Sequence, residues 1–276
     1  MKEMTTREVQ MVCLDILKDV HDFCVKNNIR YSLSGGTLLG AIRHNGFIPW
    51  DDDADIQMPR PDFEKFIKTY KSSRGYKLFS RELSDGKDLS IRIAKICEMK
   101  KTYIDLGASP WTNEKVGVDI DILPMEGAPS DRAEMERHMR KLTMLVKLCT
   151  YHHHRKIKWS EIWRYKSFKN KVKFVGRKML GLICIKDYSD KSFSLFRKYD
   201  YNSSDYFYAA IHYRMGEWQP KTNMSNCTLH KFEDTELFVM SGYKNNLKAL
   251  YGDCYMEIPP KSRQITHEQI KFYWIS

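Results

Sequence analysis

The side chains best suited to chemistry in this sequence of 276 residues are aspartates spaced two residues apart. Asp53 and Asp55 lie at the expected start of a strand, and residues two apart on a strand point to the same side. Placing like charges together is costly unless something positive sits between them. Carboxylate oxygens are the ligands that Mg²⁺ and Mn²⁺ prefer. The spacing therefore predicts a site for a divalent metal ion.

A second acidic stretch lies at residues 117–124, where apolar and acidic residues alternate. On a strand, Asp119 and Asp121 share one face and their apolar neighbours share the other. Three strand-borne carboxylates can hold two metal ions, which neutralise a phosphate and activate an attacking oxygen. A solvated loop or a calcium site could also explain an acidic run, but the glycine and final glutamate of an EF-hand loop are missing.

Gly35 and Gly36 lie between an expected strand and an expected helix. Two glycines at such a point let the backbone approach a phosphate and direct N–H groups at it. Ser34 or Thr37 could add a hydroxyl. A glycine pair alone is usually a turn, but together with the acidic stretches it favours a metal-phosphate site.

The same residues resemble the LicD family, phosphocholine transferases that share the nucleotidyltransferase fold with fukutin-type enzymes. The likeness covers residues 33–56, continues in 119–127 and returns in 251–260. It implies that Asp53 and Asp55 form the metal pair and that Asp121 is the third ligand, so these three are the expected catalytic residues. Family members often carry an apolar residue where Asp119 stands, so an extra acid lies near the site here.

The resemblance also implies an activity. The enzyme would use Mg²⁺ or Mn²⁺ to move phosphocholine, or a related phospho-alcohol, from a CDP-linked donor such as CDP-choline. The acceptor would be a hydroxyl of a cell-surface glycan precursor in lipopolysaccharide, teichoic acid or capsule biosynthesis, and CMP would be released. Related enzymes move ribitol phosphate or glycerol phosphate, so the transferred group stays open.

Two other functions are compatible with parts of the sequence. A nucleotidyltransferase would use a nucleoside triphosphate, with attack at the α-phosphorus, and the carboxylates alone do not exclude it. A non-catalytic nucleic-acid-binding protein would suit the net charge of +11. No recognised RNA- or DNA-binding motif is present, so no nucleic acid partner is expected.

Other charged residues are weaker candidates for substrate binding. Arg43, Arg92 and Lys95 lie on elements that flank the acidic stretches and could hold donor phosphates. A surface position explains each of them equally well in so basic a chain. His267 could orient the acceptor or a phosphate, and an ordinary buried histidine is an equally good explanation.

The elements that must position these residues form a mixed pattern. A Thr5-x-x-Glu8 capping box predicts a helix over residues 6–26. Further strands are expected at 29–34, 54–58, 89–97 and 115–123, with helices at 37–43 and after Pro61. We predict one α/β domain over residues 1–276: a nucleotidyltransferase-like core with a mixed sheet and a basic helical insertion at about 131–205.

The insertion contains a segment that could contact a membrane. Ten Lys or Arg and one acid, Glu161, occur between Arg155 and Lys178, and five apolar residues follow helical spacing: Phe168, Val172, Val175, Met179 and Leu182. Such a helix can lie on an anionic membrane surface, or pack on the core with a solvated basic face. Both alternatives stay open.

Three consecutive histidines, His152, His153 and His154, precede this segment. Successive residues on a helix point about 100° apart, so they cannot converge on one metal ion. A solvated helix face is expected instead.

The seven cysteines are scattered without a Cys-x-x-Cys pair, which favours a reducing compartment. The polar start of the chain predicts no secretory signal, and no apolar run reaches the length of a membrane span. A cytoplasmic enzyme is expected, with peripheral contact at the inner face of the cell membrane as an option.

Overall fold

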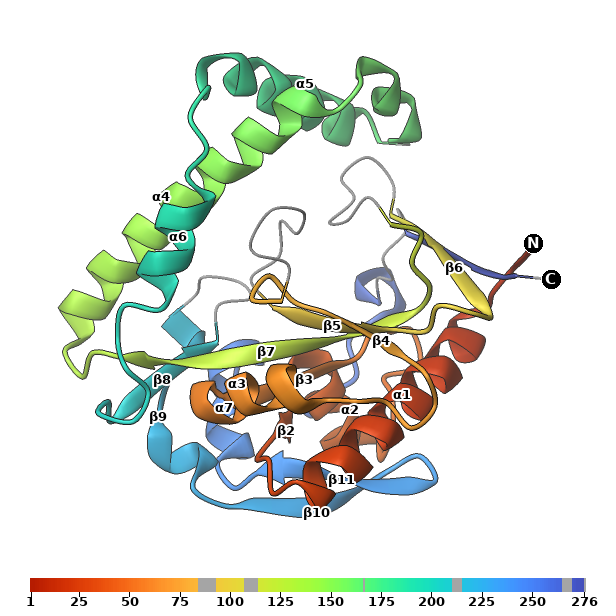
Figure 1. Cartoon of the computed structure of the whole chain (residues 1–276), viewed down its shortest axis with the longest axis vertical. Helices are drawn as coiled ribbons and strands as arrows, with labels where there is room; N and C mark the ends of the chain where they lie inside the picture. Colours follow the sequence, from red (N-terminus) through yellow and green to blue (C-terminus); the bar gives the residue numbers. More distant parts are fainter. Residues whose placement is uncertain (84–92, 107–113, 166, 210–214, 265–269, 276) are drawn as a thin grey trace.

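The computed structural model describes residues 1–83, 93–106, 114–165, 167–209, 215–264 and 270–275. Helices and strands mix along the chain, as the sequence predicts, and the strands build a curled mixed sheet (Figure 1). Arg92 and His267 lie outside the described residues.

The central strand of the main, seven-stranded sheet is β7 (Asp119–Ala128). Its first half lies between β3 (Asp55–Pro59), which is parallel to it, and β5 (Ala94–Cys97), which is antiparallel. β2 (Ser32–Leu33) and β4 (Lys77–Phe79) complete the order β2-β3-β7-β5-β4. Both acidic stretches therefore end up on neighbouring strands.

The second half of β7 pairs with β8 (Tyr206–Ala209), which in turn pairs with β9 (Trp218–Pro220). The sequence predicts that this strand ends before Pro124, but β7 continues to Ala128. Pro124 lies after the residues of β7 that pair with β5 and before those that pair with β8. Neither antiparallel ladder therefore needs the backbone N–H that proline lacks.

Three helices support the acidic part of the sheet. α1 (Thr6–Lys26) and α3 (Arg60–Thr69) contact β7, and α2 (Gly35–His44) contacts β3. The predicted capping box starts α1: the Thr5 hydroxyl accepts the Glu8 N–H, and the Glu8 carboxylate accepts the Thr5 N–H. Most of the buried apolar side chains of these helices form one cluster with β3, β5 and β7.

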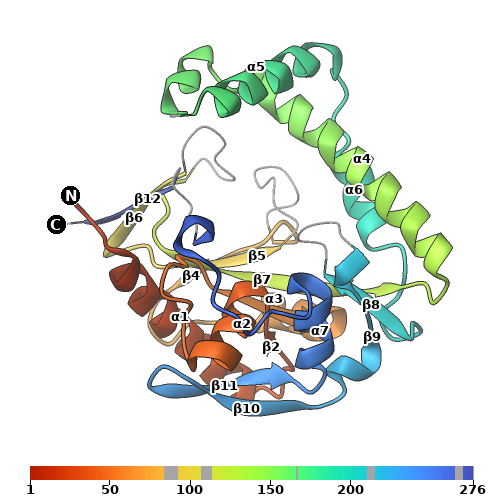
Figure 2. The same ribbon diagram turned by 180° about the vertical axis from the view of Figure 1, so that it is seen from behind.

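Smaller elements complete this body of the molecule. A three-stranded sheet joins β1 (Lys2–Glu3), β12 (Lys271–Trp274) and β6 (Thr102–Asp105), with β12 in the middle. The two ends of the chain therefore lie side by side (Figures 1 and 2). The remaining elements are the hairpin β10 (Cys227–Phe232) and β11 (Thr235–Met240), α7 (Tyr243–Tyr251), and the short 3-10 helices η2 (Met215–Glu217), η3 (Lys221–Met224) and η4 (Lys261–Arg263).

A helical arm extends from one edge of the sheet (Figure 1). We use this name for α4 (Arg132–Lys156), η1 (Trp159–Arg164), α5 (Phe168–Ile183) and α6 (Ser189–Phe196). α5 folds across the far end of α4, and α6 returns along α4 towards the sheet. The base of the arm packs through Met135, Met139, Leu142, Phe196 and Tyr208.

The expected solvated face at the three histidines is wrong. His152 and His154 are buried, because the α5 region covers this end of α4. The ring of His154 lies 6.2 Å from that of Phe174, and His152 Nδ1 lies 3.2 Å from the carbonyl oxygen of Cys184. In the part of the chain described, no helix is long and apolar enough to cross a membrane.

Candidate active site

The acidic stretches meet through the register of two parallel strands. Asp55 on β3 lies directly opposite Asp121 on β7. The residues beside them, Ile56 and Ile122, are fully buried on the other face. The alternation read from the sequence therefore places both carboxylates on the same, polar side of the sheet.

Asp53 lies in the loop before β3, because that strand starts only at Asp55. The alternation still extends back to it: Ala54 is buried, whereas Asp53 and Asp55 are partly exposed. Gln10 of α1 holds this loop, since its amide nitrogen donates to the carbonyl oxygens of Ile48 (3.0 Å) and Asp51 (2.8 Å). Gln10 is a supporting residue that the sequence did not reveal, because it lies in an ordinary amphipathic pattern.

Lys95 supplies the positive charge that the carboxylates require. β5 places it opposite Asp121, and its ammonium group donates to Asp119 Oδ1 (2.7 Å) and to Asp121 Oδ1. Its side chain is only 13% exposed. Burial alone would lower the pKa of Lys95, but Asp119 and Asp121 outweigh it and raise the pKa, so the ammonium stays charged.

Among the described contacts, the charge of Lys95 does not balance the carboxylates around Asp55. Burial raises the pKa of Asp55 well above its usual range, and repulsion from Asp53 and Asp121 raises it further. Burial also raises the pKa of Asp119, against the attraction of Lys95. The described part of the site therefore carries more negative than positive charge, which a bound cation would relieve.

The start of α2 lies against the same carboxylates. The Ser34 N–H donates to the Asp55 carbonyl oxygen (3.0 Å), and the Asp55 N–H donates to Thr37 Oγ1 (2.8 Å). A Cβ on Gly36 would lie 2.5 Å from a carboxylate oxygen of Asp51, and Gly35 has a φ of +51°. Glycine is required here because the helix start, which carries partial positive charge, touches the acidic loop.

Tyr251, the last residue of α7, also lies near the start of α2. Its hydroxyl lies 3.9 Å from the position that a Cβ on Gly35 would take. Burial raises the pKa of Tyr251, and the carboxylates of Asp55 and Asp51 raise it further. The sequence placed Tyr251 only within a stretch of family likeness, and gave it no role.

Arg43 hydrogen-bonds to the segment that follows Tyr251. Its Nη1 donates to the carbonyl oxygens of Tyr255 (3.0 Å) and Glu257 (2.9 Å). The contacts tie α2 to residues 255–257, so the structure gives Arg43 a supporting contact rather than a place beside the carboxylates. Its expected contact with a donor phosphate remains a prediction.

The donor set suits a hard cation, although the present arrangement is not a finished metal site. Among the described residues, no group of three or more His, Cys, Asp or Glu side chains is arranged to hold a metal ion. In this arrangement the Lys95 ammonium donates to an oxygen of Asp121. Asp53, Asp55 and Asp121 still offer the carboxylate oxygens that Mg²⁺ prefers, so the expected ligand set remains a prediction.

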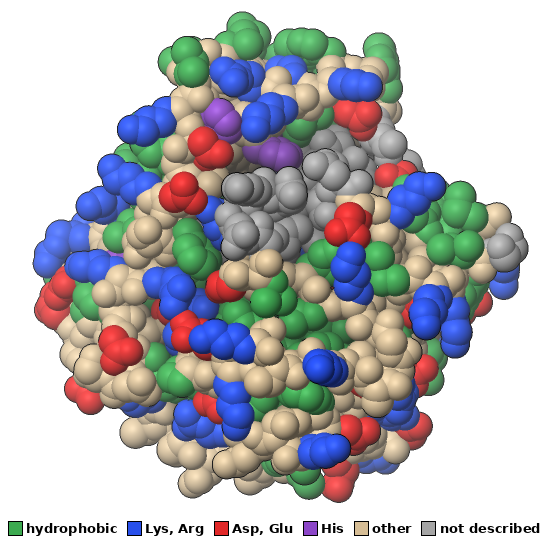
Figure 3. Space-filling model, viewed as in Figure 1, with side chains coloured by type: hydrophobic (Ala, Val, Ile, Leu, Met, Phe, Trp, Pro, Cys, Tyr) green, Lys and Arg blue, Asp and Glu red, His purple; other side chains and the backbone are tan. Residues whose placement is uncertain are grey.

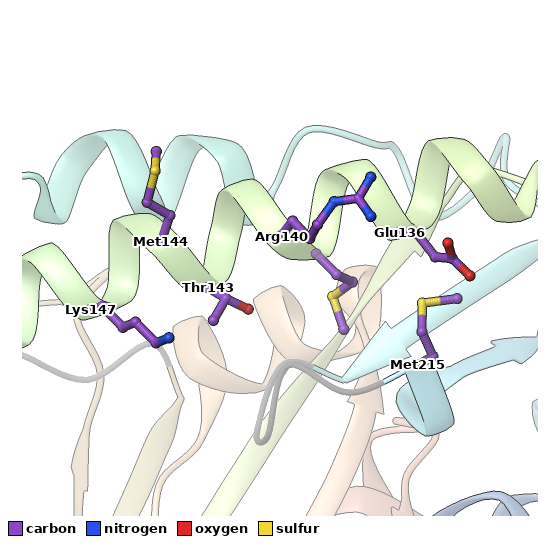
Figure 4. Close-up of a pocket in the computed structure, with 7 residues that line it drawn as sticks. Glu136, Arg140, Thr143, Met144, Lys147 and Met215 are labelled. Carbon is purple, nitrogen blue, oxygen red and sulfur yellow. The ribbon is translucent and has the colours of Figure 1, made fainter.

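A pocket of about 490 Å³ lies between α4 and η2 (Figure 4). Its lining combines charged, hydroxyl and thioether groups from Glu136, Met139, Arg140, Thr143, Met144, Lys147 and Met215. η2, which lines the pocket, also contacts α7, because Gly216 packs on the Ala249 carbonyl oxygen. α7 carries Tyr251, so the pocket and the acidic cluster are connected through these two elements. Nothing in the helical periodicity of α4 marks this pocket.

Comparison with known proteins gives a consistent picture. The family described as LicD/FKTN/FKRP, nucleotidyltransferase domain, matches residues 28–179. The lipopolysaccharide cholinephosphotransferase LicD of Haemophilus influenzae is 31% identical over 279 aligned residues, covering 97% of this chain and 97% of the relative. The ribitol 5-phosphate transferase FKRP of Homo sapiens is 44% identical over 48 residues, covering 16% of this chain and 10% of the relative.

Proposed function

The chain belongs to the LicD/FKTN/FKRP family, and on that premise we propose that it is a metal-dependent phosphotransferase with a nucleotidyltransferase-like core. The observation that carries the proposal is the register of Asp55 opposite Asp121, with Asp53 in the adjoining loop. The transferred group is proposed to be phosphocholine or a related phospho-alcohol, by analogy with the named activities of the relatives.

The reaction we propose is an in-line displacement at the β-phosphorus of a CDP-linked donor. A hydroxyl of the acceptor attacks, the bond to the bridging oxygen breaks, and CMP leaves. Asp53, Asp55 and Asp121 would hold Mg²⁺ or Mn²⁺, which when bound neutralises charge on the donor diphosphate. Asp121 accepts the proton of the attacking hydroxyl.

The chain's other site residues orient the donor. The backbone N–H groups of Gly35 and Gly36 lie at the positive end of α2, where an anionic phosphate is favoured. Lys95 is held beside the carboxylates by Asp119, so a short movement of its ammonium group from Asp121 would place it on a donor phosphate. Ser34 and Thr37 support this end of the helix.

The acceptor is proposed to be a precursor of a cell-surface glycan. The pocket between α4 and η2 offers Arg140, Thr143, Lys147 and Glu136 as hydrogen-bonding partners for sugar hydroxyls. We place the reaction in the cytoplasm, at the inner face of the cell membrane. All seven cysteines are free, which is typical of a reducing compartment.

A nucleotidyltransferase activity is the second candidate, because the matching family domain carries that description. The two reactions release different products. Incubation with Mg²⁺ and a panel of CDP-alcohols and nucleoside triphosphates should give CMP from CDP-choline or a close relative once an acceptor is present. Pyrophosphate from a triphosphate would favour the second candidate, and Asp55→Asn should give neither product.

A further inference from the structure

The outer face of α5 is a continuous apolar surface that the rest of the molecule leaves uncovered. Its side chains recur at helical spacing and all are exposed: Phe168, Val172, Val175, Met179, Leu182 and Ile183. Phe168 is 81% exposed and Ile183 is 79% exposed. We call this set the α5 stripe. Large apolar surfaces of this kind mark sites of interaction.

The opposite side of α5 fixes its orientation. Phe174 and Gly181 are buried, and a Cβ on Gly181 would lie 2.5 Å from the Tyr151 carbonyl oxygen of α4. Lys178 is also buried, and its ammonium group donates to the carbonyl oxygens of Arg155 (2.9 Å) and Ile157. These contacts hold the stripe outward, and hydrophobic side chains gather along the α5 edge of the molecule (Figure 3).

Basic groups flank the stripe. Lys169 and Lys173 are exposed on one flank, one helical turn apart. On the other flank the Lys171 ammonium lies 5.1 Å from the ring centre of Trp163, whose side chain is 78% exposed. Glu161 is the only acid in the sequence from Arg155 to Lys186.

We propose that the α5 stripe docks on an anionic lipid surface, with the helix lying in the plane of the membrane. An interfacial helix buries its apolar face at the boundary between headgroups and acyl chains and places Lys and Arg beside the headgroups. Sixteen residues give α5 a length of about 24 Å. Lys178 is not expected to contact the lipid, although it belongs to the basic segment, because its side chain is buried against the end of α4.

The α5 stripe names the residues that would hold the enzyme at the membrane. This inference rests on the proposed function only for the choice of the inner membrane face. The charge pattern favours lipid over a protein partner. Positive charge borders the stripe on both flanks with almost no acid nearby, whereas a second copy of this chain would bring the same basic residues into repulsion.

The test is binding of the full-length protein to vesicles of phosphatidylcholine mixed with phosphatidylglycerol. It should co-sediment at low salt, and binding should weaken at high salt as the surface charge is screened. Pure phosphatidylcholine vesicles should bind hardly at all, and they also control for recognition of a choline headgroup by the active site. Trp163 should shift its emission to shorter wavelength on binding, and Trp163→Phe should lose that shift.

Two sets of variants separate the apolar and the charged parts. Lys169→Gln, Lys171→Gln and Lys173→Gln together should weaken binding roughly a hundredfold, since each basic group near an anionic surface contributes about fivefold. Phe168→Ser, Met179→Ser and Ile183→Ser together should also abolish co-sedimentation. The matched controls are exposed residues elsewhere, Lys68→Gln with Lys71→Gln and Lys231→Gln, and Leu229→Ser with Ile258→Ser.

Several results would overturn the proposal. One is a wild type that ignores anionic vesicles at low salt, and another is binding that survives both variant sets. A third is a concentration-dependent dimer that the stripe variants dissolve, because it would make the surface an interface between copies. Turnover of a soluble acceptor should stay unchanged in all variants, so a loss of lipid binding alone leaves the proposed phosphotransfer intact.

Discussion

The acidic cluster and the helical arm both concentrate charge of one sign, but they hold it in opposite ways. In the cluster, Asp55 and Asp121 face each other across paired strands, and the Lys95 ammonium lies between Asp119 and Asp121. On the arm, basic side chains lie on either side of an apolar stripe, with Lys169 on one flank and Lys171 on the other.

This difference indicates what each region binds. Burial and the charges of Asp53 and Asp121 raise the pKa of Asp55, and that repulsion is relieved by a small cation bound between the carboxylates. Cations that are spread over a helix surface repel each other little and suit a large, diffuse partner of opposite charge. Substitutions in the cluster should therefore change turnover, whereas substitutions in the arm outside the pocket between α4 and η2 should change location or stability.

The largest effect is expected from the carboxylates. Asp53→Asn, Asp55→Asn and Asp121→Asn should each lower kcat at least roughly a thousandfold, because a lost metal ligand removes several kcal/mol of transition-state stabilisation. The fold should survive, and Asp55→Asn should raise the Tm of the metal-free protein, because it removes a repelled charge. Steady-state kinetics and thermal melting measure both.

Asp119→Asn is the matched control. Asp119 holds Lys95 and is not an expected ligand, so its loss should cost less than that of the three others. Near-normal activity in Asp53→Asn, Asp55→Asn or Asp121→Asn would show that the ligands are wrongly assigned.

A smaller loss of turnover is expected from Tyr251→Phe. The variant keeps the ring and removes the hydroxyl that faces Gly35 and the acidic cluster. A hydrogen bond from this hydroxyl to a charged group of the bound donor would be worth about 1.5–3 kcal/mol, so kcat should fall roughly ten- to hundredfold with an unchanged Tm. Tyr243→Phe, at the other end of α7, should leave kcat unchanged, and equal losses in both variants would assign the effect to α7 packing.

The smallest effect lies at the base of the arm and concerns pH. His138 is buried, its Nε2 lies 3.0 Å from the Tyr208 hydroxyl, and burial lowers its pKa from 6.5 to about 4. The unfolded chain therefore takes up a proton first, so stability is complete above pH 6.5 and falls as the pH drops towards 4. The loss should be about 1–2 kcal/mol after solvent screening.

His138→Gln keeps a donor for Tyr208 but does not titrate, so its urea midpoint should fall less than that of the wild type between these pH values. Turnover at neutral pH should be unchanged. A large drop in kcat in His138→Gln would contradict the separate roles of the two regions, because it would show that the base of the arm affects catalysis.

Local patterns in the sequence predicted the parts of the fold that local physics decides. The capping box at Thr5 gave the start of α1, and alternation gave the shared face of Asp119 and Asp121. The start of α2 was placed too late, at Thr37, because glycine is a poor helix former. In the structure Ser34 occupies the N-cap position, and the glycines that follow form the first residues of the helix.

Long-range packing decided the rest. Lys95 could be a surface cation until the antiparallel pairing of β5 with β7 set it opposite Asp121. Tyr251 is nearly two hundred residues from Asp55 in sequence and meets the site only through α7. His152 and His154 looked solvated because the periodicity of α4 carries no information about the α5 region that covers them.

The small sheet at the chain ends has a consequence for synthesis on the ribosome. β12 lies between β1 and β6 and is their only link within the described sheet. β1 leaves the ribosome long before β12, so in the described sheet its strand partner is missing until residues 271–274 follow, after the acidic cluster and the arm have emerged. Ribosome-bound chains that stop before residue 271 should therefore keep the first residues open to proteases, and released chains should protect them.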